Sequence, residues 1–295
     1  MIVSGTNISV RGSLLRVARL SAEGYEFLEE SPEPIIALLK KGNPQADLFT
    51  FTQRVPNTTP QHPYFMEWDN CAAIEVASFE QWWKQIRPEA RNRARQAEKK
   101  GVVIREVPFD ETLARGIWEI YNECPIRAGR RFPHYGKDPG TVFTQAATFL
   151  DSSVFIGAFL EEKLIGFVKL TTNQTKTQAN LMNILSLMAH RDKAPTNALI
   201  SHAVRACADR KIAYLIYQRF TYGKKKSDGI MKFKETNGFR QFDLPRYYVP
   251  LTLRGRIALR LGLHHRLADR LPESLVGRLR DFRNDWYNHK LQVAR

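Results

Sequence analysis

The stretch VFIGAFLEEKLIGFVKL, residues 154–170, decides the fold of this chain. Two apolar segments flank the polar pair Glu161-Glu162, and this pattern predicts a tight antiparallel hairpin. The chain then continues as an apolar strand, a polar loop, a helix, a strand, a basic loop, a short helix and a final strand. These segments are residues 181–188, 189–195, 196–210, 212–220, 221–228, 229–238 and 239–251.

This succession resembles the GCN5-related N-acetyltransferase superfamily. The resemblance implies that a central strand splays from its neighbour, and that the following loop and helix N-terminus hold the pyrophosphate of a cofactor through free backbone N–H groups. The family's loop reads Arg/Gln-x-x-Gly-x-Gly/Ala, and an ungapped overlay places it on residues 191–198. Arg191 fits, whereas Ala194 and Thr196 replace the glycines, and their Cβ atoms obstruct a close approach of phosphate.

A second resemblance is carried by GIMKFKETNGF at residues 229–239 and by the segment PRYY at residues 245–248. These are similar to the FK-x-x-x-GF motif and closing strand of Fem-type peptidyltransferases and of related polysaccharide-biosynthesis acetyltransferases. Upstream, RNRARQAEKKGVVIREV at residues 91–107 resembles the Arg-rich helix and first strand of those proteins. The likeness extends over residues 80–250.

The two resemblances imply an α/β protein with a mixed, mostly antiparallel sheet of the acetyltransferase (GNAT) type, flanked by helices. We expect three parts: a smaller N-terminal α/β half at 1–79 that is a degenerate GNAT-like repeat, a GNAT-like catalytic domain at 80–250, and a basic amphipathic helical tail at 251–295. Local signals predict further elements. They are a helix at 35–41, a strand at 47–54, a loop at 55–63, a strand pair at 64–76, a helix from Ser78 to a break at Pro88, and a helix at 89–100 that ends at Gly101.

The composition is that of a globular protein that works in a reducing compartment. Hydrophobic residues make up 43% and charged residues 25% of the chain, and no apolar run approaches the ~20 residues of a membrane span. The 3 cysteines have no CxxC spacing, and the N-terminus has no secretory pattern, so we expect a cytoplasmic protein without disulfides or metal. The net charge of +15 favours an anionic partner such as a nucleotide, a tRNA, a lipid-linked saccharide or an acidic membrane surface.

The resemblance places the cofactor contacts in the loop and in two later basic positions. The candidates are Leu187, Met188, His190, Arg191, Asp192, Lys193, Thr196, Asn197, Lys224 and Lys234. A Thr or Asn at the helix start can cap it, and the Arg and Lys side chains can pair with phosphates. The alternative is a plain helix cap with solvated charges.

The catalytic candidates are His134, Tyr222 and Glu67. His134 is the predicted base, because imidazole titrates near neutrality. Tyr222, beyond the strand 212–220, corresponds to a tyrosine that protonates the thiolate leaving group in related enzymes, and Glu67 is an alternative base. Each has a structural alternative, since a lone His is more often part of the core.

The substrate-binding candidates come from the segments PIRAGRRFPHYGK and MEWDN. They are Arg127, Arg130, Arg131, Tyr135, Trp68 and Asp69. Arginines can recognise a carboxylated or phosphorylated acceptor, and an indole can stack on a sugar. The alternative for MEWDN is a strand end with a turn at Asp69-Asn70.

These features lead to an acyltransferase that moves an acyl group, by resemblance acetyl from acetyl-CoA or another acyl-CoA, onto an amine such as an amino sugar in cell-surface polysaccharide synthesis. A Fem-type transferase that uses aminoacyl-tRNA is the alternative within enzymes. A non-catalytic nucleic-acid-binding protein with a degenerate fold is the alternative outside them. The tail helices either dock on the core or contact an anionic membrane, which would place the protein at its inner face.

Overall fold

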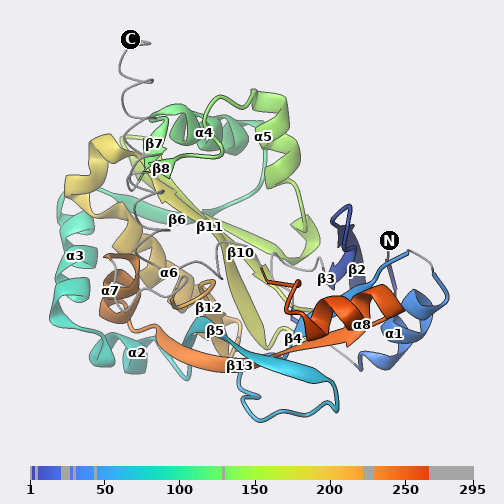
Figure 1. Ribbon diagram of the computed structural model, residues 1–295. Helices are drawn as coiled ribbons and strands as arrows, with labels where there is room; N and C mark the ends of the chain where they lie inside the picture. The colour runs from blue at the N-terminus through green and yellow to red at the C-terminus, as the bar shows by residue number, and fades with distance from the viewer. Residues whose placement is uncertain are drawn as a thin grey trace.

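The computed structural model describes residues 2–3, 6–20, 27–28, 31–42, 45–127, 130–221 and 229–265. One eleven-stranded sheet runs through this part in the order β1-β2-β3-β4-β13-β5-β12-β11-β10-β9-β6, with β7 and β8 as a separate hairpin (Figure 1). The strands are β1 Ile2–Val3, β2 Thr6–Arg11, β3 Val17–Leu20, β4 Leu48–Thr52, β5 Phe65–Glu75, β6 Val103–Val107, β7 Ile126–Arg127, β8 Arg130–Arg131, β9 Ser153–Leu160, β10 Lys163–Thr172, β11 Gln178–Ser186, β12 Tyr214–Ile216 and β13 Arg240–Pro250.

Helices cover both faces of this sheet. They are α1 Glu33–Lys40, α2 Phe79–Gln85, α3 Pro88–Lys99, α4 Glu111–Asn122, α5 Pro139–Ala146, α6 Pro195–Asp209, α7 Gly229–Thr236 and α8 Leu253–Arg260, with 3-10 turns η1 Leu150–Ser152 and η2 Met188–Lys193. Tyr121 of α4 contacts Phe167, whereas Leu199 of α6 packs against Gly166. Because neighbouring residues of a strand face opposite sides, α4 and α6 lie on opposite faces of β10.

The predicted hairpin is confirmed as β9 and β10, which pair antiparallel with Leu160 opposite Lys163. Its turn consists of Glu161 and Glu162, whose φ angles are 49° and 64°. Two consecutive residues in the left-handed region give the tight turn whose twist matches that of the flanking strands. The predicted position and length of this connection are confirmed. The predicted α/β fold class is confirmed as well.

Strand β5 corrects one prediction. The stretch 64–76 was expected to form a strand pair, but residues Phe65–Glu75 form one continuous strand. This strand pairs antiparallel with β13 on one side and with β12 on the other. Strands from the first 79 residues and from the GNAT-like part thus share one sheet, and the division at residue 79 stays a prediction.

The predicted helix signals around Ser78 are confirmed. Its hydroxyl accepts the N–H of Gln81 at the start of α2, the chain breaks before Pro88, and α3 ends beside Gly101 at φ +76°. The expected helix at 35–41 and strand at 47–54 are present as α1 and β4. No helix in the described residues is long and apolar enough to span a bilayer.

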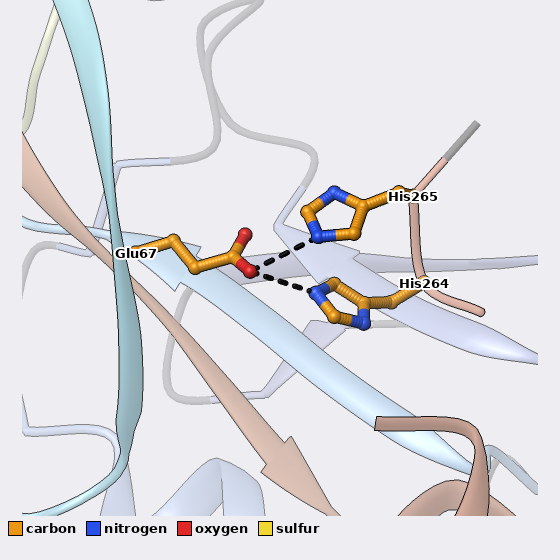
Figure 2. Close-up of side chains that lie close together, drawn as sticks. All are labelled: Glu67, His264 and His265. Carbon is orange, nitrogen blue, oxygen red and sulfur yellow. Dashed lines mark hydrogen bonds and ion pairs between the residues drawn. The ribbon is translucent and has the colours of Figure 1, made fainter. Parts of the chain in front are cut away.

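The described part of the predicted tail contains one helix, α8, which ends at Arg260, and residues 261–265 form turns rather than continuing the expected helix. Helix α8 follows β13, and His264 and His265 then bring the chain back to Glu67 on β5 (Figure 2). The second predicted tail helix lies outside the described residues.

The largest hydrophobic core lies between the central strands and the helices on both faces. Ile156 of β9, Val168 of β10, Leu199 and Val204 of α6 and Ile117 of α4 are fully buried in it. A smaller cluster in the N-terminal part joins α1 to β4 and β13. The two cores keep the middle of the sheet, where β11 and β12 meet, fixed from either side.

Candidate functional site

Strands β11 and β12 part from each other after three residue pairs. They run parallel from Gln178↔Tyr214 to Asn180↔Ile216. Beyond this point β11 continues along β10 to Ser186. The segment after β12 instead follows β5, where the N–H of Tyr217 donates to the carbonyl of Ala72. Residues 181–186, which we call the open edge, have no strand partner on the β12 side among the described residues. This is the splay that the acetyltransferase resemblance implied.

The loop after the open edge contains a left-handed residue but no glycine. Ala194, which replaces a family glycine, adopts φ 52°, in the left-handed region that glycine usually fills. Pro195 opens α6 and carries no N–H, and no described atom accepts the N–H of Thr196. The Thr196 hydroxyl lies 3.1 Å from that of Ser186, and Asn197 donates to Asn237 at 3.1 Å, so neither side chain caps the helix.

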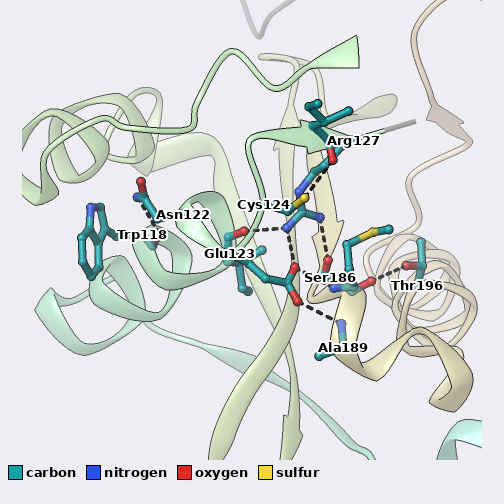
Figure 3. Close-up of polar contacts among 11 residues, drawn as sticks. Trp118, Asn122, Glu123, Cys124, Arg127, Ser186, Ala189 and Thr196 are labelled. Carbon is teal, nitrogen blue, oxygen red and sulfur yellow. Dashed lines mark hydrogen bonds and ion pairs between the residues drawn. The ribbon is translucent and has the colours of Figure 1, made fainter. Parts of the chain in front are cut away.

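The carboxylate of Glu123 occupies the start of this loop (Figure 3). It accepts the backbone N–H groups of Met188 at 2.7 Å and Ala189 at 2.9 Å. It also pairs with Arg127 at 3.0 Å, whose guanidinium donates to the carbonyls of Ser186 and Ile120 at 2.8 and 2.6 Å. The anion held by the first loop amides is therefore a side chain of the protein itself.

This network changes the role of Arg127. The sequence suggested an acceptor contact, but the side chain is only 11% exposed and its guanidinium is directed at internal groups. We therefore assign it a positioning role. Arg131 and Tyr135 of the same segment are exposed. For Arg130 the structure describes the place in β8 but not the side chain. The acceptor contacts of these three residues stay predictions.

The remaining loop side chains face different surroundings. Asp192 pairs with Lys100 of α3 at 3.0 Å and lies 3.5 Å from Lys193. Leu187 is buried, and its N–H donates to the carbonyl of Ile165. His190 keeps a buried Nδ1 for which the described residues offer no partner. Arg191 is exposed, and its phosphate contact stays a prediction.

His134 stacks beside the open edge. Its ring lies 4.5 Å from the ring of Tyr121, whose hydroxyl accepts the amide of Asn183 on β11 at 2.9 Å. Lys137 lies 3.2 Å from Nδ1 of His134, and because an ammonium can only donate, this places the imidazole proton on Nε2. Burial and then the charge of Lys137 lower the pKa of His134. The ring is thus neutral at pH 7 and presents an N–H donor, so the predicted base role would need the other tautomer.

The residues of MEWDN alternate across β5. Asp69 lies between Arg246 at 2.8 Å and Arg219 at 2.9 Å. Burial alone would raise the pKa of Asp69, but the two guanidinium groups hold it below its usual value. Glu67, on the same face, lies 3.1 Å from Nε2 of His264 and 3.0 Å from Nε2 of His265, two residues that the sequence did not single out. Trp68 points to the opposite face and is 60% exposed. A stacking role for Trp68 and a base role for Glu67 stay predictions.

The FK-x-x-x-GF motif has a structural explanation. Lys234 is fully buried, its ammonium donates to the carbonyl of Arg219, and it lies 4.6 Å from the ring centroid of Tyr217. Gly238 adopts φ +86°, and a Cβ there would lie 2.8 Å from Ile86. The motif therefore joins α7 to the chain after β12. A phosphate contact by Lys234 stays a prediction, and Tyr222 and Lys224 lie outside the described residues.

A cavity of about 650 Å³ lies away from the open edge, between α2, α3, β6 and α6. Phe79, Trp83, Arg95 and Arg205 contribute to its lining, and none of the predicted site residues does. Shape alone would place a ligand there. We place the candidate site at the open edge because unpaired backbone, a charged network and a neutral histidine converge on it.

Comparisons with solved structures support this fold. No protein-family model and no curated protein sequence matches the chain. The crystal structure of FemX matches with a TM-score of 0.57 at 9% identity, covering 85% of both chains. L-PGS from Bacillus licheniformis matches with 0.55 at 11% identity, covering 82% of this chain and 80% of that one. The C-terminal domain of a putative lysylphosphatidylglycerol synthetase from Agrobacterium fabrum matches with 0.54 at 12% identity, covering 86% and 83%. The Fem-type resemblance is therefore confirmed at the level of the fold.

Proposed function

We propose that the protein is an acyltransferase that binds a phosphate-bearing acyl carrier along the open edge and transfers the acyl group to an amine or hydroxyl. The parting of β11 from β12 after Asn180 is the observation that carries this proposal. An unpaired strand edge presents N–H and C=O groups that can hold an extended arm by main-chain hydrogen bonds. The basic balance of the chain, +15, suits an anionic carrier.

Aminoacyl-tRNA is the carrier that we favour. Glu123 already holds the amides of Met188 and Ala189, and the Cβ atoms of Ala194 and Thr196 narrow the place where a pyrophosphate would approach. FemX and the two lysylphosphatidylglycerol synthetases match most of both chains, which supports a Fem-type use of the fold. A tRNA end can bind along the open edge without using these loop amides.

Acyl-CoA is a second candidate, and one observation favours it. Ala194 takes the left-handed conformation of the missing glycine, and the N–H of Thr196 next to it has no described partner. One free amide at a helix start can hold one phosphate oxygen. Acetyl-CoA as donor and an amino sugar or lipid-linked saccharide as acceptor rest on this amide and on the sequence resemblance.

The chemistry requires that the nucleophile lose a proton, that the oxyanion be stabilised and that the leaving oxygen or sulfur be protonated. The Nε2–H of His134, beside the open edge, can donate to a developing oxyanion. The ring of Tyr121 contacts the ring of His134, and Asn183 donates a hydrogen bond that holds the Tyr121 hydroxyl. Tyr222 as the acid and Trp68 as a platform for a sugar acceptor complete the proposal as predicted contacts.

A thermal-shift comparison tests the donor class. Charged tRNA, uncharged tRNA, acetyl-CoA and CoA are each added to the full chain at two salt concentrations. A ligand at 100 times its Kd stabilises the folded state by about 2.7 kcal/mol. We expect charged tRNA to raise the melting temperature more than uncharged tRNA. A larger rise with acetyl-CoA would favour the second candidate, and no preference for any acylated ligand would contradict the enzyme proposal.

A further inference from the structure

Three side chains from two distant parts of the chain converge at the surface of β5 (Figure 2). Glu67 lies near the start of β5, and His264 and His265 follow α8. Both histidines point their Nε2 atoms at the same carboxylate oxygen, at 3.1 Å for His264 and 3.0 Å for His265. In the described residues this is the one group of three such side chains whose ligand atoms all lie within 4.8 Å of one another.

These distances are close to those of a metal site. Zinc binds imidazole nitrogen at about 2.0–2.1 Å and carboxylate oxygen at about 2.0–2.2 Å, so two ligands of a tetrahedral site lie roughly 3.3 Å apart. The observed separations of 3.1 and 3.0 Å need to widen by only a few tenths of an ångström to admit the ion. Two imidazoles with one carboxylate are also a donor set that such borderline ions prefer.

The surroundings give this group one closed side and one open side. The side chain of His264 is 3% exposed, and its ring lies 4.5 Å from that of Tyr248 and 6.2 Å from that of Phe65. This aromatic shell restricts water on one side. His265 is 39% exposed and Glu67 30%, so an ion can enter from the other side and retain a water as its fourth ligand.

Within this group the hydrogen bond runs between Nε2 of His264 and Glu67. His264 Nδ1 is buried, and the described residues provide no partner for it. The Nε2 atom of His265 lies 3.0 Å from the same oxygen of Glu67, so two ring nitrogens crowd one carboxylate oxygen. An imidazole that binds a metal through Nε2 carries its proton on Nδ1, so binding would replace these Nε2 contacts by coordination.

We propose that Glu67, His264 and His265 bind one divalent transition-metal ion of the zinc class. The ion would join the segment after α8 to β5, next to Trp68 and Asp69, which are substrate-binding candidates. Its coordination has three protein ligands and a fourth position open to water. This inference concerns a site separate from the open edge and does not depend on the acyltransferase proposal.

Calorimetric titration of the chelator-treated full chain with Zn²⁺, and absorption with Co²⁺ as the spectroscopic probe, test the proposal. We expect one equivalent to bind, with the visible bands of low-symmetry, four-coordinate cobalt and without the near-ultraviolet band of a cobalt–thiolate bond. Glu67→Gln keeps an acceptor oxygen for both imidazoles but is a poor metal ligand, and we expect it to weaken binding at least tenfold. His265→Ala, at an exposed position, should do the same.

Matched controls separate this site from general histidine binding. His202→Ala, on α6, should leave the affinity and the cobalt spectrum unchanged. Zn²⁺ should raise the melting temperature of the wild type and of His202→Ala but not of Glu67→Gln. Absence of saturable binding, or equal binding by the wild type, Glu67→Gln and His265→Ala, would overturn the proposal. A thiolate band would assign the ion to a cysteine and overturn it as well.

Discussion

The carboxylate of Glu123 lies 2.7 Å from the backbone nitrogen of Met188, at the point where a fold of this type would otherwise offer a free amide to an anion. Glu123 ends α4, and an acidic residue at a helix C-terminus is unfavourable toward the helix dipole. Its position is nevertheless stable because the amides of Met188 and Ala189 and the guanidinium of Arg127 surround it. The loop that should bind a carrier is thus held in shape by an internal anion.

Replacing Glu123 by Gln should destabilise the protein. The ion pair with Arg127 is mostly buried, at 11% and 19% exposure, and a buried guanidinium without its counter-charge is costly. We expect a loss of roughly 2–4 kcal/mol in the free energy of unfolding, measured by urea denaturation. Glu119→Gln, on an exposed position of the same helix, should change it by less than about 0.5 kcal/mol. Equal free energies of unfolding for the two variants would show that the contacts of Glu123 with Arg127 and the loop amides do not stabilise the protein.

His134 should have a pKa below the ordinary value of an imidazole. Burial and Lys137 lower its pKa below 6.5, so the unfolded chain binds this proton more tightly than the folded one. The contribution of His134 to the free energy of unfolding is therefore highest above pH 6.5, and it falls as the pH drops through the pKa of the folded state. A proton NMR titration should place the His134 pKa below 6.5 and show that Lys137→Met raises it. Lys163→Met, on β10, is the control and should leave it in place.

Lys169 should make stability rise with pH in an alkaline window. Burial lowers its pKa from 10.5 to about 8, although its ammonium donates to the Ala146 carbonyl at 2.8 Å. The unfolded chain then binds more protons between pH 8 and 10.5, and the wild type should gain free energy of unfolding over this window, on the order of 3 kcal/mol.

Two single variants of β10 test whether this pH dependence of the free energy of unfolding comes from Lys169. Lys169→Met should lack this gain, whereas Lys163→Met, at an exposed position of β10, should follow the wild type. Stability profiles from pH 7.5 to 10.5 that are parallel for all three proteins would contradict a depressed pKa at Lys169.

Gly238→Ala should cost about 2 kcal/mol or more. The residue adopts φ +86°, and the new Cβ would lie 2.8 Å from Ile86 and 3.0 Å from Trp82. Gly229→Ala is the matched control, because nothing lies within 4 Å of its Cβ position and it begins α7. Thermal unfolding should show a large loss for the first variant and none for the second. Similar melting temperatures would mean that the motif glycine is not required by packing.

The sequence was most informative where local chemistry decides structure. The Glu161-Glu162 turn, the Ser78 cap and the Gly101 stop depend on a few neighbouring residues, and all three were predicted correctly. The interpretation of Asp69-Asn70 as a turn was wrong, because contacts distant in sequence decide the structure there. Arg246 and Arg219 bind Asp69, and Asn70 accepts the N–H of Thr221, so the partners of these two side chains come from residues 150 to 177 positions later.

The same limit applies to the site. The loop and its helix were located correctly from the order of elements along the chain. Glu123 was missed because the amides that bind it, those of Met188 and Ala189, follow β11 and are distant in sequence. An acid at the end of a helix, followed four residues later by Arg127, is a signal that could have indicated it. His264 and His265 meet Glu67 only through the register of β5 with β13, which no local pattern encodes.

The most direct test of the account is to locate the acyl group on the protein. Ile184→Cys places a thiol on the open edge, and a tRNA charged with a bromoacetylated amino acid should alkylate it, with loss of bromide. Mass spectrometry should find the adduct at position 184, formed at least tenfold faster than at Lys163→Cys and suppressed by unmodified charged tRNA. Equal labelling of both cysteines, or labelling unaffected by the competitor, would contradict the proposal that the open edge holds the acyl carrier.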